Sequence, residues 1–373
     1  MAIASINPAT GETVRTFTEL TDAELDRKLQ VAADTFRSYR RTSYSQRAEL
    51  LRRTADVLEA DADRLARLAT LEMGKTLASA VAEVHKCVRG CRWYADHGAG
   101  LLADEPYEVA GARVFTRYEP LGPVLAVMPW NFPYWQVFRF ICPALMAGNV
   151  GLLKHASNVP QVALAIEETL RQGGFADGVF QTLLIGSGKV AAVIDDDRVR
   201  AVTLTGSEPA GRHVGALAGK NIKPSVLELG GADAFVVMPT ADLDQAVENA
   251  VASRMLNNAQ SCINAKRFIV HAQIADEFTR RLVEKLQGLR IGDPTESDTD
   301  LGPLSSADAV DTLDQQVQGT VKAGARLLTG GGRLDRPGNY YPPTVLTDIP
   351  DDSPGHHEEF FGPVALVWRA ADV

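Results

Sequence analysis

Cys262 is the residue whose type and setting best suit it to nucleophilic chemistry. It ends the polar run Asn257–Cys262, between a predicted helix over residues 242–257 and a predicted strand over residues 266–271. A thiolate needs solvation or positive potential, and a polar loop supplies the first of these. A lone cysteine is also commonly an inert packing residue, so this residue by itself leaves both interpretations open.

Glu228 is the second candidate, because a carboxylate can activate a water molecule. It lies in the apolar run Val226–Leu229, directly before Gly230 and Gly231. We expect it to be buried, and burial raises the pKa of a carboxyl group towards the range of a general base. The alternative is a buried glutamate that is paired with a lysine or an arginine.

Two glycine patterns follow predicted strands and are suited to binding phosphate. Gly186–Ala191 reads GxGxxA, and Glu208 lies 20 residues after its second glycine, near where a ribose-binding acid is expected. The second pattern, Thr203–Ser207, ends an apolar strand, and Gly211 follows five residues after its glycine. Glycines let backbone N–H groups approach a pyrophosphate at the start of a helix. A plain glycine turn accounts for either pattern taken singly.

The sequence offers no convincing metal site. Cys87 and Cys91 are four residues apart on a predicted helix, but His85 points to a different helical face and no second ligand pair follows at zinc-like spacing. His356 and His357 are adjacent and lack the i, i+4 spacing of a helical metal site. We therefore predict helical packing for the cysteines, a solvated loop for the histidines and no bound metal.

The elements that position these residues are predicted from hydrophobic periodicity. The first hundred residues are expected to be helical, with a capping box at Thr21–Glu24, and residues 107–118 are expected to form a hairpin. From Pro120 onward, strands alternate with helices, which indicates a parallel sheet covered on both faces. We predict strands over residues 125–128, 151–153, 179–185, 201–205, 226–229, 234–238 and 266–271, and helices over residues 161–171, 242–257, 275–289 and 307–323.

Composition excludes several classes of partner. The 373 residues include 38 Lys and Arg against 47 Asp and Glu, a net charge of −9, so we predict no nucleic-acid partner. Four cysteines are too few for a disulfide framework, which favours a reducing compartment and hence a cytoplasmic protein. The uncharged stretches 120–138 and 140–153 contain five prolines, so we predict no membrane span.

Four motifs follow one another along the chain: Pro129–Pro133, Leu227–Gly231, the turn Gln260–Cys262 with Arg267, and Glu359–Pro363. In composition and order they resemble the motifs of the aldehyde dehydrogenase superfamily. Within it, the chain is most similar to the succinate-semialdehyde dehydrogenases, through Leu152–Ala156 and Asn339–Pro343. The resemblance extends over the whole chain and implies an α/β fold of the aldehyde dehydrogenase type.

The resemblance also implies a division into domains. We place a Rossmann-type coenzyme-binding domain at residues 1–103 and 120–228, a β-hairpin for oligomerisation at residues 104–119, and an α/β catalytic domain at residues 229–373. The family continues well beyond Glu359–Pro363, so the catalytic domain is expected to be C-terminally incomplete. A homodimer or homotetramer is expected, in which the hairpin pairs with a neighbouring subunit.

The resemblance assigns the chemistry to three residues. Cys262 is expected to attack the aldehyde carbon, Asn131 to hold the oxyanion, and Glu228 to activate the water that hydrolyses a thioester. The expected reaction is the NAD(P)-dependent oxidation of an aldehyde to a carboxylic acid, most specifically of succinic semialdehyde to succinate. The alternatives are a broad-specificity or betaine-aldehyde dehydrogenase, and a truncated, non-catalytic nucleotide-binding protein.

The cofactor implied by the resemblance is NADP or NAD. Lys154 is expected at the adenosine ribose. Ser157 stands where an acidic residue would repel a 2′-phosphate, which favours NADP. The remaining residues implied at the cofactor are Gly206, Ser207 and Gly211 at the pyrophosphate, Glu359 and Phe361 at the nicotinamide ribose and ring, and Trp130.

Two further residues follow from comparison with the family pattern. Arg139, eight residues after Asn131, matches an arginine near the substrate carboxylate in succinate-semialdehyde dehydrogenases. The alternative for Arg139 is an ion pair within the fold. Ala259 replaces the glycine of the family's Gly-Gln-x-Cys turn, and because alanine tolerates a positive φ poorly, we expect a shifted backbone beside Cys262.

Overall fold

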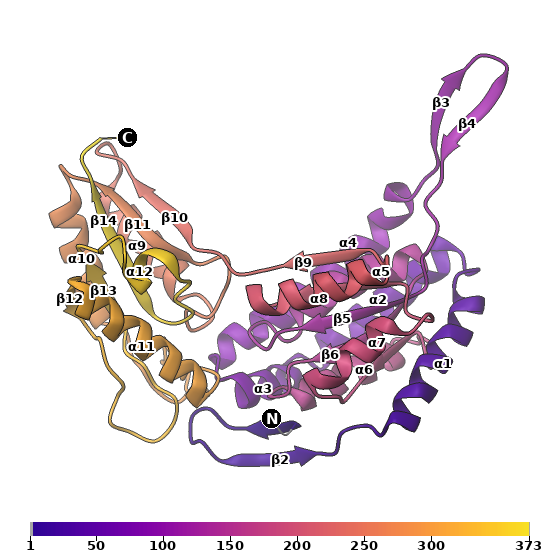
Figure 1. Cartoon of the computed structure of the whole chain (residues 1–373), viewed down its shortest axis with the longest axis horizontal. Helices are drawn as coiled ribbons and strands as arrows, with labels where there is room; N and C mark the ends of the chain where they lie inside the picture. Colours follow the sequence, from indigo (N-terminus) through magenta and orange to yellow (C-terminus); the bar gives the residue numbers. More distant parts are fainter. Residues whose placement is uncertain (1–2, 373) are drawn as a thin grey trace. The chain divides into compact units, whose positions relative to one another are not determined.

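A computed structural model describes residues 3–372 and divides the chain into two compact units (Figure 1). The first unit comprises residues 3–5, 14–69 and 81–229, and the second comprises residues 6–13, 70–80 and 230–372. Two short segments that we had placed in the coenzyme-binding domain therefore pack with the second unit. The functional roles of the predicted domains stay predictions.

The first unit contains a five-stranded parallel sheet of order β7-β6-β5-β8-β9. Its central strands are buried along almost their whole length, as expected when helices cover both faces. The chain moves outward from β5 to β7 in one direction and from β8 to β9 in the other, so the strand order reverses between β5 and β8. The strands are β5 (Pro123–Met128), β6 (Val150–His155), β7 (Phe180–Thr182), β8 (Ala201–Thr205) and β9 (Ser225–Glu228).

Helices cover this sheet, and several of their ends are visible in the sequence. The predicted capping box at Thr21 and Glu24 is confirmed at the start of α1, and Ser43 with Gln46 forms another at the start of α2. Helix α2 packs against α5 and α6, whereas α8 packs against α7 and against β8 and β9. The helices are α1 (Asp22–Tyr39), α2 (Tyr44–Ala60), α3 (Ala62–Met73), α4 (Leu77–Leu101), α5 (Trp135–Ala147), α6 (Pro160–Gln172), the 3₁₀ turn η1 (Ser187–Lys189), α7 (Val190–Asp195) and α8 (Glu208–Lys220).

The start of the chain is a two-stranded sheet, so the prediction that the first hundred residues are all helical was wrong there. Strand β1 (Ile3–Ile6) pairs with β2 (Thr13–Phe17). Gly11, with φ 81°, completes the turn between them and donates from its backbone N–H to Asn7 O at 2.7 Å. The β-branched and aromatic residues of β2 favour a strand over a helix.

The predicted hairpin is confirmed as β3 (Glu105–Val109) and β4 (Ala112–Thr116), an antiparallel pair that turns at Gly111. It projects from the rest of the first unit (Figure 1). Both strands are exposed along almost their whole length. The role of the hairpin in oligomerisation stays a prediction.

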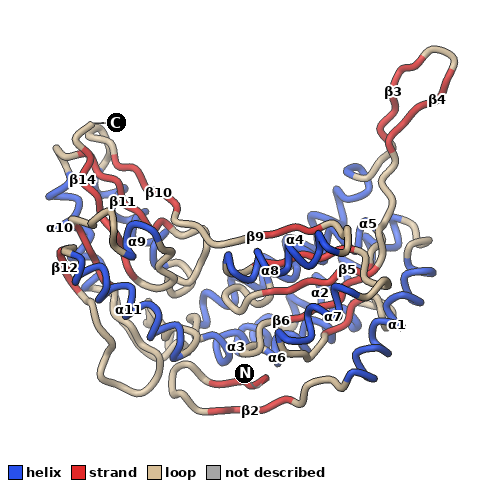
Figure 2. The backbone as a smooth tube through the Cα atoms, in the orientation of Figure 1, coloured by secondary structure: helices blue, strands red, loops and turns tan. Residues whose placement is uncertain are grey.

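The second unit contains a five-stranded sheet of order β10-β11-β14-β13-β12, in which only β12 runs antiparallel to its neighbour. Figure 2 shows its strands and those of the first unit as separate sheets, each accompanied by helices. Its elements are β10 (Asp233–Val237), α9 (Leu243–Met255), β11 (Ala265–His271), α10 (Ala275–Gln287), α11 (Ala307–Ala323), β12 (Arg326–Thr329), β13 (Thr344–Thr347), α12 (Pro354–His357) and β14 (Val364–Ala370).

Alternation along β14 divides the interior of the second unit into two cores. Ala365 and Val367 belong to a cluster with residues of α9 and α10, whereas Val364 and Leu366 belong to a cluster with residues of α11. Successive side chains of a strand point to opposite faces, so one apolar strand supplies both cores. None of the helices described over residues 3–372 is long and apolar enough to cross a membrane.

Candidate functional site

The loops after β5 and β8 form the predicted cofactor side of the site. Gly206 directly follows β8, and Ser207 is the N-cap residue of α8, a helix of 13 residues. Trp130 and Asn131 lie in the loop after β5. In open α/β sheets, ligands bind at the carboxyl ends of the strands where the order reverses, and phosphates favour helix N-termini. This arrangement fits a dinucleotide.

The competing GxGxxA pattern is placed less well for binding a phosphate. Gly186 lies four residues beyond the end of β7, and the helix that follows, α7, has only six residues. A short helix after an irregular segment presents a weaker and less defined N-terminus than α8. The structure therefore favours Gly206 and Ser207 over Gly186 as the phosphate-binding turn.

Lys154 and Ser157 lie at the carboxyl end of β6. Lys154 is buried, and desolvation lowers the pKa of its ammonium group. Ser157 lines a small hollow together with Pro160 of α6 and Leu184, at the ends of β6 and β7. The cation of Lys154 and the absence of an acidic side chain at Ser157 suit an adenosine ribose that carries a 2′-phosphate.

The loop that carries Asn131 is held by Glu83, a residue that sequence reasoning missed. Oε1 of Glu83, on α4, accepts hydrogen bonds from the backbone N–H groups of Tyr134 and Trp135, each at 2.8 Å. Glu83 is only 4% exposed, and Asn131 is also buried. A carboxylate at the start of α5 satisfies donors that the helix leaves without an intrahelical partner. No local pattern signals this role, because Glu83 lies 51 residues before Tyr134.

His155 holds the same loop from the end of β6. Its Nε2 lies 2.9 Å from Pro133 O, and its Nδ1 accepts a hydrogen bond from the backbone N–H of Ala156 at 2.9 Å. Because Nδ1 is an acceptor, the proton is on Nε2, which donates to Pro133 O. Burial lowers the pKa of His155 to about 4, so the ring is neutral at pH 7.

Glu228 is exposed, so the prediction that its side chain is buried was wrong. It ends β9, the edge strand of the sheet, and its side chain is 55% exposed. Oε2 of Glu228 lies 3.5 Å from Nη1 of Arg139, whose Nη2 donates to Thr205 Oγ1 at 3.2 Å. An exposed ion pair of this kind contributes only about 0–1 kcal/mol, so a substrate carboxylate could displace Glu228 from Arg139.

The Cys262 loop contains three successive residues with positive φ. Asn257, Asn258 and Ala259 have φ values of 59°, 54° and 60°. Ala259 therefore adopts the backbone that glycine favours, at a cost of about 1–2 kcal/mol. The side chain of Asn258 offsets this strain, because its Nδ2 donates to Gly74 O at 2.7 Å and its Oδ1 accepts from Gly302 N at 3.1 Å. Cys262 is partly exposed.

The motif Glu359–Pro363 is anchored by Arg254, which sequence reasoning also missed. The Arg254 side chain is fully buried and donates to Val364 O at 2.7 Å, to Phe360 O at 2.9 Å and to Gly362 O. Burial lowers the pKa of Arg254 to about 9, and the nearby Glu359 carboxylate opposes this shift. Gly230 packs against this motif so closely that an added Cβ would clash with Glu359 Oε2.

The predicted residues fall into two groups, one in each unit. Within the first unit, Glu228, Arg139 and Thr205 meet through their side chains, and Gly206 N donates to Glu228 O at 3.0 Å. The first unit holds Trp130, Asn131, Arg139, Lys154, Ser157, Gly206, Ser207, Gly211 and Glu228, and the second holds Cys262, Glu359 and Phe361.

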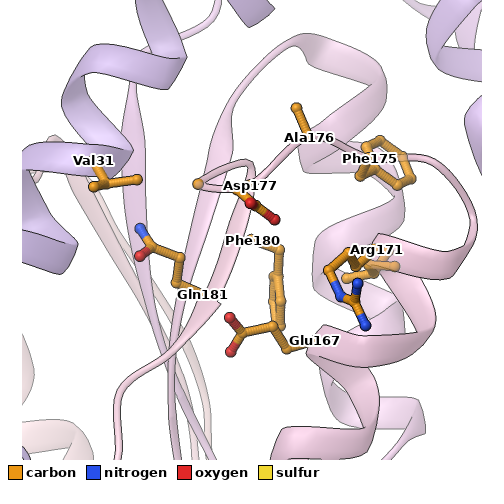
Figure 3. A pocket seen from close by; sticks show the side chains of 10 residues that line it. Val31, Glu167, Arg171, Phe175, Ala176, Asp177, Phe180 and Gln181 are labelled. Carbon is orange, nitrogen blue, oxygen red and sulfur yellow. The ribbon is translucent and has the colours of Figure 1, made fainter.

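Another pocket of the first unit lies away from these residues. It is lined by side chains of α1, α6 and the segment around β7, among them Val31, Glu167, Arg171, Phe175 and Gln181 (Figure 3). No predicted site residue lines it, so we assign it no role. Among residues 3–372, no group of three or more His, Cys, Asp and Glu side chains is arranged to hold a metal ion.

Comparison with known proteins agrees with the motifs over the full length. A sequence profile of the aldehyde dehydrogenase family matches residues 1–373. Succinate-semialdehyde dehydrogenase [NADP(+)] 1 of Mycobacterium tuberculosis (strain ATCC 25618 / H37Rv) is 58% identical, with 100% of this chain and 82% of that protein aligned. Succinate-semialdehyde dehydrogenase [NADP(+)] of Mycobacterium avium (strain 104) is 57% identical, over 100% of this chain and 80% of that protein.

Solved structures agree with these relatives. The crystal structure of succinic semialdehyde dehydrogenase from Streptococcus pyogenes, in complex with NADP+, superimposes with a TM-score of 0.97 at 36% identity, over 100% of this chain and 82% of that one. With a matching sequence profile, close relatives and a shared fold, this chain belongs to the aldehyde dehydrogenase family.

Proposed function

We propose that this chain oxidises succinic semialdehyde to succinate with NADP, through a thioester on Cys262. The observation that carries the proposal is the gathering of Gly206, Ser207, Arg139 and Glu228 beside β8 and β9, where the sheet order favours a dinucleotide and Arg139 offers a cation. The names of the relatives at 57–58% identity support the same substrate and cofactor.

The proposed chemistry uses Cys262, Asn131 and Glu228. Sγ of Cys262 gives up its proton to water and bonds to the aldehyde carbon, while the π electrons of the carbonyl move to its oxygen and leave a thiohemiacetal oxyanion. The Asn131 amide and the Cys262 backbone N–H donate to its oxygen. NADP, when bound, supplies the acceptor for the hydride. Loss of that hydride leaves a thioester on Cys262, and Glu228 takes a proton from the water that hydrolyses it. Succinate leaves, and the thiol is restored.

Cofactor choice is tested by comparing kcat/KM for NADP and NAD. We expect NADP to be preferred, because Ser157 provides a hydroxyl where an acidic side chain would repel a 2′-phosphate and Lys154 adds a cation nearby. A hundredfold preference for NAD would overturn this part of the proposal.

Substrate choice is tested at Arg139. Arg139→Ala should raise KM for succinic semialdehyde at least tenfold, because a charge-assisted hydrogen bond to its carboxylate is lost. The same change should affect an uncharged aliphatic aldehyde of similar length far less. Equal effects on both aldehydes would show that Arg139 serves only the ion pair with Glu228, and would leave the chain a broad-specificity aldehyde dehydrogenase.

We also propose a homo-oligomer that is built through the β3–β4 hairpin. The hairpin exposes large apolar side chains, including Tyr107, Val114 and Phe115. A contiguous exposed apolar surface favours a protein contact. Light scattering should give a dimer or tetramer, and Val114→Lys should shift it to the monomer. The four cysteines are free thiols, which suits the cytoplasmic location that we propose.

A further inference from the structure

Lys266 is a buried cation beside the Cys262 loop that the proposed chemistry does not use. It lies on β11, four residues after Cys262, and its side chain is only 1% exposed. Lysine is almost never fully buried unless its ammonium group is paired. Desolvation lowers the pKa of Lys266, and the Glu359 carboxylate opposes this shift. The burial of its ammonium group must therefore be offset by specific contacts.

Three oxygen atoms surround the ammonium group at equal distances. Nζ of Lys266 lies 2.8 Å from Gly231 O, 2.8 Å from Cys262 O and 2.8 Å from Glu359 Oε1. An ammonium group has three N–H donors and no acceptor, so these three oxygens match its capacity. The three partners come from three separate places in the chain: the Gly230–Gly231 turn, the Cys262 loop and the Glu359 motif.

The contacts join two residues with different expected tasks. Cys262 is the proposed nucleophile, and Glu359 is expected at the nicotinamide ribose. One side chain therefore touches the backbone of the first and the carboxylate of the second. An apolar side chain would fill the same space but could hold neither oxygen, and it would leave the Glu359 carboxylate without this cation.

We propose that Lys266 is a positioning residue that fixes the Cys262 loop and the Glu359 carboxylate relative to each other. It thereby sets the position of the nucleophile relative to the nicotinamide end of the cofactor. This inference rests on the proposed roles of Cys262 and Glu359. It does not depend on which aldehyde the enzyme oxidises.

The test uses the full chain without any aldehyde. Lys266→Met keeps an unbranched side chain, one atom shorter, and removes the donors. Lys285→Met changes an exposed lysine of α10, paired with Glu248, and serves as the control. Two quantities are measured: the rate at which iodoacetamide alkylates Cys262, followed by peptide mass from pH 6 to 9, and the Kd for NADPH. The thermal unfolding midpoint of each variant shows whether it is folded.

We expect Lys266→Met to slow alkylation of Cys262 about tenfold, because the Cys262 loop loses the donor that holds its backbone oxygen. We expect its Kd for NADPH to rise about tenfold, because Glu359 loses its anchor. Lys285→Met should match the unmodified protein in both measurements.

The proposal is wrong if folded Lys266→Met keeps both the alkylation rate and the Kd for NADPH within twofold of wild type. It is also wrong if only one of them changes, since a residue that holds both Cys262 and Glu359 must affect both. If Lys266→Met does not fold, Lys266→Arg carries the test. Its planar guanidinium keeps the charge but cannot match three converging oxygens, so the Kd for NADPH should still rise severalfold. Wild-type values for Lys266→Arg would then overturn the proposal. Failure to oxidise succinic semialdehyde would contradict only the proposed substrate.

Discussion

Replacement of Glu83 tests whether a buried carboxylate on α4 holds the loop that carries Asn131. Glu83 Oε1 accepts two backbone hydrogen bonds at 2.8 Å, from Tyr134 and Trp135, and the side chain is 4% exposed. Glu83→Ala removes both acceptor contacts and leaves two donors at the start of α5 without this partner. Glu83→Gln removes the charge but keeps a side-chain oxygen in the same place.

The expected magnitudes follow from these contacts. A hydrogen bond to a charged group contributes about 1.5–3 kcal/mol, so the loss of two should lower the free energy of unfolding by about 3–6 kcal/mol in Glu83→Ala. The neutral amide oxygen of Glu83→Gln should retain most of this, for a loss of about 1–2 kcal/mol. Because total stability is about 5–15 kcal/mol, the alanine variant should be clearly weakened.

The assay is urea unfolding followed by tryptophan fluorescence, together with kcat for aldehyde oxidation. Glu49→Ala is the control, because Glu49 makes an exposed ion pair with Arg53 whose loss should cost about 0.5 kcal/mol or less. We expect kcat to fall in the order wild type, Glu83→Gln, Glu83→Ala, as the Asn131 loop loosens. An alanine variant within 1 kcal/mol of wild type, or a glutamine variant as damaged as alanine, would refute the reasoning.

Two further predictions concern His155 and the thiols. Unfolded histidine binds a proton near pH 6.5, whereas burial lowers the pKa of folded His155 to about 4, so stability should fall by about 3 kcal/mol in total as the pH drops through this range. The urea midpoint of wild type should therefore fall more steeply than that of His155→Gln between these pH values, and parallel curves would contradict the assignment. In the native protein, a thiol reagent should label Cys262 and leave the buried thiols of Cys87, Cys91 and Cys142 unmodified. Labelling of more than one cysteine before denaturation would contradict the burial of these three.

Much of the fold could be predicted because its signals are local. The helix predicted over residues 307–323 has the bounds of α11, because its apolar residues recur with helical spacing. In the structure, the Ser306 side chain caps this helix by accepting a hydrogen bond from Ala309 N. The strand predicted over residues 179–185 is longer than the observed strand β7, because only Phe180–Thr182 pairs with β6. The apolar side chains of Leu183 and Ile185 are buried without belonging to a strand.

The site was predicted less completely, because its supports depend on contacts between distant segments. Glu83 meets a loop 51 residues further along the chain, and Arg254 meets carbonyl groups more than 100 residues away. Nothing in the neighbouring sequence of either residue marks it as buried. Glu228 was misjudged for a related reason: its apolar neighbours suggest burial, but β9 is an edge strand, and only the strand order shows this.

The central claim is that Cys262 forms a covalent acyl intermediate on the way from succinic semialdehyde to succinate. The most direct test mixes Glu228→Gln protein with succinic semialdehyde and NADP and locates any adduct by peptide mass. Because the variant lacks the carboxylate that activates water, we predict a succinyl thioester that accumulates on the Cys262 peptide and is absent in Cys262→Ser. NADPH formation by Cys262→Ser at the wild-type rate, or an adduct on another residue, would contradict the account.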